Sequence, residues 1–282
     1  MLVAVAAPAG AAEPGAPAGA SAEAVTALTD LLASIDAVRA LTYHFVKRER
    51  LRDGTLTDSE HEVKWLAPGR VYMKTLRPRP GQEVLFDPTR DARRLIVHTG
   101  RFPDFTLHLD VDGSLATSGE HHLVSHVGLA YIATVLRRSA ERVRREPMGE
   151  TARLERRCEG GACRDRLVLV AGTRPPARVM AEAGEAVVAF AERAGVDPYL
   201  VVYTNPDVDG LSSHLRRREY VVPAYYGSRT EVVIDPSTRL PLAQTVWDDQ
   251  GRLYEDYRFD ELRCDPPLVE ADFDPANRTY GF

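Results

Sequence analysis

Alternating hydrophobic and polar positions predict that β-strands dominate this chain. In residues 105–111, Phe105, Leu107, Leu109 and Val111 alternate with polar side chains, which is the pattern of a strand with one buried face. Shorter runs of the same kind are bounded by proline, glycine or aspartate. We therefore expect about eleven antiparallel strands, at residues 41–51, 60–66, 71–76, 84–86, 94–98, 105–111, 152–157, 165–170, 230–234, 242–247 and 252–263.

Two stretches follow the helical period instead. Residues 24–40 place Leu28, Leu31 and Ile35 on one stripe, and a second, long helix is expected after Ser125 as its N-cap. Helices that gather on one side of an antiparallel sheet are typical of α+β or barrel-like architectures. This many strands curled around a helix would form a half-open barrel with an apolar interior.

Residues 178–223 interrupt the strands with a predicted strand, two short helices and a second strand. Gly195 is a natural stop for the first helix, and Pro198 is a natural first-turn residue for the next. Asn205-Pro206 then ends the second helix. We therefore predict an inserted βααβ unit at residues 177–225.

This inserted unit resembles a LysM domain, a small βααβ module that binds N-acetylglucosamine-containing glycans such as peptidoglycan. The resemblance rests on Asp197-Pro198-Tyr199, Asn205-Pro206 and Val222-Pro223, with glycines at 184 and 195. In that family the glycan lies between the loop after the first strand and the loop after the second helix. The resemblance therefore implies these candidate glycan-binding residues: Gly184, Glu185, Ala186, Asn205, Pro206 and Asp207.

Net charge and local composition give information about binding partners and cellular compartment, but little about an activity. The formal net charge of −5 over 282 residues argues against a general affinity for nucleic acid. Residues 1–24 begin with an apolar segment like the second half of a secretory signal, followed by an Ala/Pro/Gly-rich spacer that we expect to be unstructured. The alternative is that residues 1–24 are simply a disordered tail.

The basic run at 137–157 has two interpretations. It could bind anionic head groups, or it could be a solvated face with local ion pairs, since glutamates are interleaved.

Cysteine usage agrees with export. Cys158 and Cys163 flank a Glu-Gly-Gly-Ala turn between two strand-like runs, so we predict a disulfide bond across this hairpin, which would stabilise the fold by roughly 2–3 kcal/mol. Cys264 is left as a lone thiol. A metal site at the cysteine pair is the poorer interpretation, because no second Cys/His pair has a matching spacing.

Several separated motifs are spread through the body of the chain. They are Leu41–Arg50, Val71–Lys74, Gly81–Leu85, His122 with Gly128-Leu129, Ile234–Pro236 with Leu240–Leu242, Tyr257–Leu262, and Ala271–Pro275 with Tyr280 and Phe282. Together these motifs resemble one bacterial family catalogued as domain-of-unknown-function family 1571, which is grouped with LolA-like lipoprotein carriers. The resemblance implies a LolA-like half-open antiparallel β-barrel with lid helices, built from residues 25–176 and 226–282 around the insertion. The family has no established catalytic residues to transfer.

Carriers of the LolA type hold acyl chains in the concave face of the barrel, and the resemblance implies a similar cavity here. Burying about 16 methylenes would contribute roughly 12 kcal/mol, against association costs of about 4–15 kcal/mol. The alternative is that the same side chains simply fill a core. The candidate lipid-binding residues are Phe45, Trp65, Met73, Phe86, Leu107, Leu109, Tyr131, Leu169, Trp247, Tyr257 and Phe259.

Known catalytic and cofactor motifs do not occur in the sequence. His121, His122 and His126 are the nearest likeness to a metal site, but no carboxylate or cysteine stands at a companion spacing. We therefore interpret them as polar residues at a helix entrance and expect no metal. No Gly-x-Ser-x-Gly, phosphate loop or dinucleotide fingerprint is present, so we expect a protein that is not an enzyme and has no cofactor.

Together these patterns lead to the hypothesis of an exported protein of the bacterial periplasm, peripheral to the membrane at most. It would bind a lipid or a lipidated protein in the half-barrel, while the inserted unit docks on peptidoglycan or an envelope protein. Two alternatives stay open. One is a structural or scaffolding protein with a filled barrel core and a protein-binding insertion, and the other is a sensor whose occupancy alters a partner surface.

Overall fold

The computed structural model describes residues 19–159 and 161–282. The signal-like segment predicted at residues 1–12 lies outside this range. Residues 19–23, which we expected to be unstructured spacer, are instead ordered as a short strand, Gly19–Ala20, and the start of a helix at Ala22. Ser21 joins the two: its backbone N–H donates to the Ala152 carbonyl, and its hydroxyl caps the helix by accepting from the N–H of Ala24.

Fourteen strands are present in the described residues, and twelve of them form one sheet. The strands are β1 (Gly19–Ala20), β2 (Ala40–Arg50), β3 (Leu56–Leu66), β4 (Arg70–Arg77), β5 (Glu83–Phe86), β6 (Arg94–His98), β7 (Thr106–Asp110), β8 (Thr151–Glu159), β9 (Ala162–Val170), β10 (Ala177–Met180), β11 (Glu219–Val222), β12 (Arg229–Ile234), β13 (Pro241–Trp247) and β14 (Leu253–Cys264).

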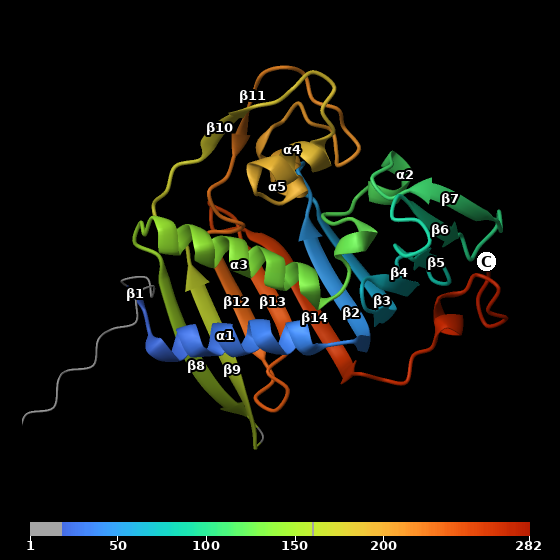
Figure 1. The fold of residues 1–282 in the computed structure, drawn as a ribbon, viewed down its shortest axis with the longest axis horizontal. Coiled ribbons are helices and arrows are strands. Elements are labelled where there is room, and N and C mark those ends of the chain that lie inside the picture. The colour runs from blue at the N-terminus through green and yellow to red at the C-terminus, as the bar shows by residue number, and fades with distance from the viewer. Residues whose placement is uncertain (1–18, 160) are drawn as a thin grey trace, which may run out of the picture.

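The large sheet is open and runs in the order β1-β8-β9-β12-β13-β14-β2-β3-β4-β5-β6-β7. Its pairs are antiparallel except for β1 and β8. Eleven of these strands correspond to the predicted runs, and the twelfth is β1, whose two residues carry no alternation to reveal it. In Figure 1 the strands near β7 turn across the direction of β8–β14. The α+β class is therefore confirmed.

Short local signals set the register of the central hairpin. β2 and β3 pair from Ala40↔Leu66 to Arg50↔Leu56, which leaves a tight turn at Asp53-Gly54. Gly54 has a φ of 88°, a conformation that glycine adopts without steric cost. The Asp53-Gly54 pair thus ends the first strand where the sequence predicted.

Along the chain the helices and 3-10 turns fall between strands, except for η2, which follows β14. Helices α1 and α3 lie across one face of the large sheet (Figure 1), and each buries a stripe at helical spacing, Ala24, Ala27, Leu31 and Ile35 in α1. The elements are α1 (Ala22–Ala37), α2 (Ser114–Thr117), η1 (Val124–His126), α3 (Leu129–Arg145), α4 (Val187–Ala194), α5 (Pro198–Thr204) and η2 (Glu270–Phe273).

Helix α3 begins later than the sequence predicted. Its N-cap is Gly128, and Ser125 lies in the preceding 3-10 turn η1 instead of capping the helix. Gly128 has a φ of 105°, and a Cβ at this position would lie 2.9 Å from the ring of Trp65. The chain therefore turns into α3 where it packs directly against β3, a contact that only glycine permits.

The inserted segment forms its own small core on top of the sheet. Strands β10 and β11 pair antiparallel, with α4 and α5 between them in sequence, so the strand-helix-helix-strand order is as expected. Phe190, Ala191 and Val201 are fully buried in this core, which also includes Val246 and Tyr254 of the large sheet. The likeness to LysM domains stays a prediction, but the segment is packed onto the body.

Both expectations about the cysteines are met in the structure. Cys158 and Cys163 form a disulfide bond across the β8-β9 hairpin, and Cys264 is a free, exposed thiol. Phe273 in η2 is fully buried and packs with Tyr72 and Leu85, so it anchors the C-terminal tail on the outer side of β4 and β5. Within the described residues, no helix is both long and apolar enough to cross a membrane.

Candidate functional site

Two adjoining cavities lie on the helix-covered face of the sheet. The first, of about 290 Å³, is lined by side chains of β2–β7 and β14, by α2 and α3, and by the loop between these helices. The second, of about 440 Å³, lies between α1, α3 and strands β8, β9 and β12. Val135, Tyr226 and Gln244 line both cavities. Volumes of this order are typical of pockets for small molecules.

Most of the predicted lipid-binding residues face these cavities. Leu169 lines the second cavity, while Trp65 and Phe86 are buried in the core. Leu107 and Trp247 line neither of the two cavities described above. The first cavity is lined by the remaining six, which are Phe45, Met73, Leu109, Tyr131, Tyr257 and Phe259.

Trp247 is excluded from the cavities by the period of its strand. Gln244 and Val246 of β13 are buried on the inner side, so the next residue points to the other face of the sheet. There the Trp247 ring lies under the guanidinium of Arg229, 5.2 Å from its centroid. The hypothesis that Trp247 contacts lipid inside the barrel is therefore wrong.

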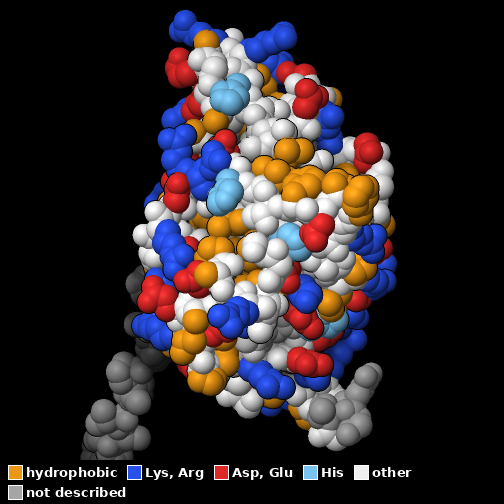
Figure 2. Space-filling view, turned by 90° about the vertical axis from the view of Figure 1, so that its right-hand side faces the viewer, with side chains coloured by type: hydrophobic (Ala, Val, Ile, Leu, Met, Phe, Trp, Pro, Cys, Tyr) orange, Lys and Arg blue, Asp and Glu red, His pale blue; other side chains and the backbone are white. Residues whose placement is uncertain are grey.

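The far end of the molecule, around β6, β7 and α2, also exposes hydrophobic side chains. Phe102 is 98 % exposed, Leu115 74 % and Phe105 43 %. Figure 2 views the molecule from the side on which β6 and β7 lie and shows hydrophobic side chains gathered near the middle of that face, among charged ones. Leu115 of α2 also lines the first cavity, so apolar character continues from the cavity to the surface.

The first cavity has a charged end that sequence reasoning did not anticipate. Glu49 and Glu255 are paired directly across β2 and β14, and they are 2 % and 0 % exposed. Like charges in this position repel each other, so both carboxylates need cationic or donating neighbours. Glu49 accepts from Lys47 Nζ at 3.2 Å and from the Tyr257 hydroxyl at 2.6 Å. Burial would raise the pKa of Glu49, but Lys47 and the nearby histidines outweigh this and lower it.

Glu255 is held by two histidines and a tyrosine. His121 Nδ1 lies 2.8 Å from its Oε1, and His121 Nε2 donates to the Arg50 carbonyl oxygen at 2.9 Å. His122 Nε2 lies 3.1 Å from the same carboxylate oxygen, and the Tyr226 hydroxyl lies 2.7 and 2.6 Å from the two oxygens. Burial would raise the pKa of Glu255, but the charge of His122 and these hydrogen bonds hold it well below its ordinary value.

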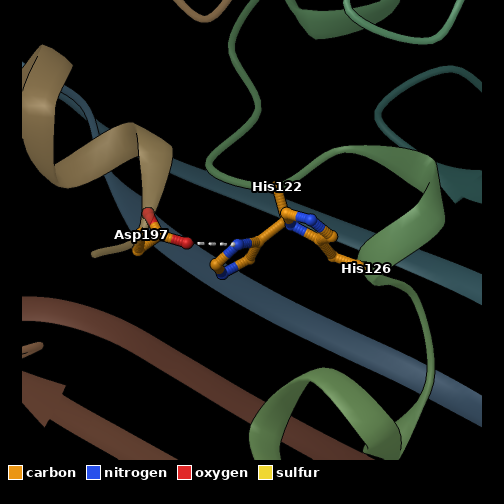
Figure 3. Close-up of side chains that lie close together, drawn as sticks. All are labelled: His122, His126 and Asp197. Atoms are coloured by element: carbon orange, nitrogen blue, oxygen red, sulfur yellow. Dashed lines mark ion pairs between the residues drawn. The ribbon is translucent and has the colours of Figure 1, made fainter. Parts of the chain in front are cut away.

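The inserted segment contributes a third carboxylate, Asp197, which is the N-cap of α5. Its Oδ1 accepts from the backbone N–H groups of Tyr199 and Leu200 at 2.8 and 3.3 Å. Its Oδ2 accepts from the Tyr131 hydroxyl and lies 3.4 Å from Nδ1 of His122. Asp197 is only 4 % exposed. Figure 3 shows Asp197 and His126 reaching His122 from different segments.

His122 is therefore placed between two buried acids. Burial would lower its pKa, but the negative charges of Glu255 and Asp197 outweigh burial and raise the pKa well above 6.5. Its ring also lies next to Tyr131 and Tyr226. The arrangement forms a rigid polar wall at one end of an otherwise apolar cavity.

The expectation of no metal at the three histidines rested on a premise that the structure overturns. The histidines do have companion carboxylates, supplied by segments far away in the sequence. Two groups have ligand atoms within 4.8 Å of one another and could hold an ion: His122, His126 and Asp197, and Glu49, His121 and Glu255. For Glu49 a signal existed, since Tyr43, Phe45, Lys47 and Glu49 share one face of β2, and a charged pair on the inner face of a strand is unusual.

Asn205 and Glu185, two of the candidate glycan-binding residues, make hydrogen bonds or ion pairs to other residues of the insertion. Asn205 is 5 % exposed, and its amide nitrogen donates to the carbonyls of Val201 and Val221 while its oxygen accepts from the Val221 N–H. It therefore joins α5 to β11 and has no free group for a sugar, contrary to its predicted role. Glu185 pairs with Arg193.

The other glycan candidates lie at the surface of the insertion. Gly184 has a φ of 79°, and Ala186 forms an isolated bridge with His214. The Pro206 carbonyl accepts from Arg52 at 2.6 Å, and Asp207 pairs with Arg218. A role for these residues in binding sugar stays a prediction.

His61, which also lines the first cavity, predicts a pH-dependent loss of stability. Burial lowers its pKa to about 3, so in the folded state it stays neutral while the unfolded chain takes up a proton below about 6.5. The contribution of His61 to the free energy of unfolding is therefore fully present above pH 6.5 and is lost as the pH drops towards 3. We expect His61→Gln to remove about 2 kcal/mol of the loss between pH 7.5 and 5, measured by urea denaturation at both values.

His108→Gln serves as the matched control for this measurement, because His108 is exposed on β7. It should lose as much stability between the two pH values as the wild type does. An unchanged acid slope in His61→Gln would show that His61 is not held neutral in the folded protein.

Comparison with known proteins gives a family and a set of remote structural likenesses. The match to LprF from Mycobacterium bovis covers 90 % of this chain and 98 % of LprF, with 12 % identity and a TM-score of 0.42. For a LolA superfamily protein, NE2245 from Nitrosomonas europaea, the shares are 89 % and 97 %, with 10 % identity and a TM-score of 0.31. For the MucA/MucB complex of Pseudomonas aeruginosa they are 90 % and 61 %, with 14 % identity and a TM-score of 0.36.

No curated protein matches the chain. A family model, described as a protein of unknown function (DUF1571), matches residues 38–216 and 207–282. These two matches cover the large sheet from β2 onward, helix α3 and the inserted segment. The chain therefore belongs to the DUF1571 family.

Proposed function

We propose that this protein binds the acyl chain of a lipid, or of a lipidated protein, between its sheet and helices α1 and α3, in the bacterial cell envelope. The observation that carries the proposal is the pair of adjoining cavities of about 290 and 440 Å³ on one face of the sheet. A filled core, as in a purely structural protein, would leave no such volume because protein interiors are close-packed.

The lining chemistry supports an amphiphilic ligand. Helix α1 contributes Val25, Leu28 and Leu32 to the second cavity, while Lys47 and His122 stand at the polar wall of the first. An acyl chain would bury apolar surface between α1 and α3, and a head group would meet the charged side chains. The disulfide bond of the β8-β9 hairpin agrees with an oxidising compartment.

A chain-length series tests this proposal directly. Each methylene buried contributes about 0.8 kcal/mol, so the affinity for fatty acids should rise about fourfold per added methylene until the cavities are filled. Val135 of α3 lines both cavities, and Val135→Trp should therefore weaken the uptake of a fluorescent fatty acid about tenfold or more. Displacement titrations measure both effects.

Ala130→Trp is the control variant, because Ala130 is exposed on the same helix and belongs to neither cavity lining. It should bind the probe as the wild type does. Circular dichroism and the thermal midpoint establish that both variants fold. Equal uptake by the wild type and Val135→Trp, or no uptake together with no co-purifying lipid in native mass spectrometry, would disprove the proposal.

A further inference from the structure

Two buried ring nitrogens next to Asp197 have no hydrogen-bond partner among the described residues. They are Nδ1 of His122 and Nδ1 of His126. Buried polar atoms in native proteins are nearly always satisfied, because leaving one unpaired is costly. Both residues and Asp197 offer ligand atoms within 4.8 Å of one another. Imidazole nitrogens without a hydrogen bond in the same cluster as a buried carboxylate are what a cation site presents to its ion.

The outer contacts of His122 and Asp197 match those of metal ligands. A metal-binding histidine usually donates its other ring N–H to a carboxylate, which fixes the ring. His122 Nε2 has this contact, 3.1 Å from Glu255 and 3.1 Å from the Tyr226 hydroxyl. Asp197 is fixed through its other oxygen, Oδ1, by two backbone N–H groups of α5. Oδ2 accepts from the Tyr131 hydroxyl and also faces Nδ1 of His122 at 3.4 Å.

This spacing suits a small tetrahedral ion. Two ligands that each lie about 2.0 Å from a zinc ion are about 3.3 Å apart, close to the separation of His122 Nδ1 and Asp197 Oδ2. The ligand atom of His126 lies within 4.8 Å of the other two, so its ring must move closer to close the third side. It lies in the short turn η1, and its ring is stacked on Tyr131 with 3.8 Å between centroids.

The second cluster of acids and histidines does not require an ion. Both ring nitrogens of His121 are already paired, with Glu255 at 2.8 Å and the Arg50 carbonyl at 2.9 Å. Glu49 is satisfied by Lys47 and Tyr257. This group therefore acts as the support of the first one, and of the two groups only that of His122, His126 and Asp197 contains ring nitrogens without a hydrogen bond.

We propose that His122, His126 and Asp197 bind a divalent first-row transition cation. Two imidazoles and one carboxylate form a ligand set suited to Zn²⁺ and its neighbours, and they leave one coordination position for water or another ligand. His122 and His126 also line the first cavity, so the ion lies in its wall. Because Asp197 belongs to the insertion, the ion ties the insertion to the α2–α3 loop of the body.

The test uses the untagged full chain carrying Cys264→Ser, because Cys264 is an exposed thiol that could itself hold zinc. The protein is stripped with a chelator and titrated with ZnCl₂ by calorimetry, and a parallel sample receives Co²⁺. We expect one equivalent of zinc per chain and visible Co²⁺ absorption bands of tetrahedral type. In His126→Ala and His126→Gln the zinc affinity should fall about tenfold or more, and the Co²⁺ bands should be lost.

His108→Ala is the control, since this exposed histidine lies on β7, and it should bind zinc as the parent does. Circular dichroism checks that the His126 variants fold, and two different replacements guard against loss of binding through unfolding alone. Less than a stoichiometric equivalent of bound zinc in the parent would overturn the proposal, as would equal binding by the parent and both folded His126 variants. Fatty-acid uptake is measured separately, so the proposed lipid function can fail or succeed independently.

Discussion

Glu255→Gln should lower the free energy of unfolding by about 3–5 kcal/mol, because removing one partner of a buried ionic network leaves the other charges uncompensated. Glu255 is fully buried and contacts His121, His122 and Tyr226. A neutral amide cannot balance the positive charge of His122, and its NH₂ group cannot accept the hydrogen bonds that the carboxylate accepts. Urea denaturation at neutral pH measures the change.

The matched control is Asp260→Asn, because Asp260 lies on the same strand but is exposed, with its nearest cation, Arg258, 3.7 Å away. Exposed ion pairs contribute about 0–1 kcal/mol, so this variant should be nearly as stable as the wild type. A loss of less than about 1 kcal/mol in Glu255→Gln would mean that the network relaxes or hydrates when one charge is removed.

Phe190→Ala should cost about 3–5 kcal/mol, the usual range for truncating a fully buried aromatic side chain. Phe190 of α4 is 0 % exposed and packs edge-on against Tyr220 of β11, with 5.8 Å between ring centroids. Its cluster continues into Val246 and Tyr254 of the large sheet. We therefore expect one cooperative unfolding transition, shifted as a whole, in denaturation followed by circular dichroism and tryptophan fluorescence.

Phe105→Ala provides the comparison, because Phe105 is 43 % exposed and its truncation should cost about 0.5 kcal/mol or less. Two separate transitions in Phe190→Ala, with the second at the wild-type midpoint, would instead show that the insertion unfolds on its own. In that case the contacts with Tyr254 would not couple the insertion to the body.

The metal proposal and the stability of the buried network are linked through Glu255. As a support of His122, this carboxylate stabilises the fold and also orients the ring that faces Asp197. The charged wall therefore has a structural role in the absence of any ligand. A charge cluster of this kind in a cavity wall is also where specificity for a head group would arise.

Local patterns in the sequence determined most of the elements of this protein. Alternation located eleven of the twelve strands of the large sheet, the Asp53-Gly54 pair located a hairpin turn, and Gly195 with Pro198 separated the two helices of the insertion. These signals succeed because strand and helix periods, turn conformations and caps depend on neighbouring residues only. β1 was not predicted, because a strand of two residues is too short to show an alternating pattern.

Only the tertiary structure decided the site. Alternation tells which side chains face inward, and on β13 it places Trp247 on the outer face. Whether the inward side chains fill the space or line a cavity depends on how far α1 and α3 stand from the sheet. Glu49, His122, Asp197 and Glu255 meet only because β2 pairs with β14 and the insertion packs on their ends. The spacing of these residues along the chain cannot predict that they form a cluster, because the cluster is produced by strand pairing between segments about two hundred residues apart.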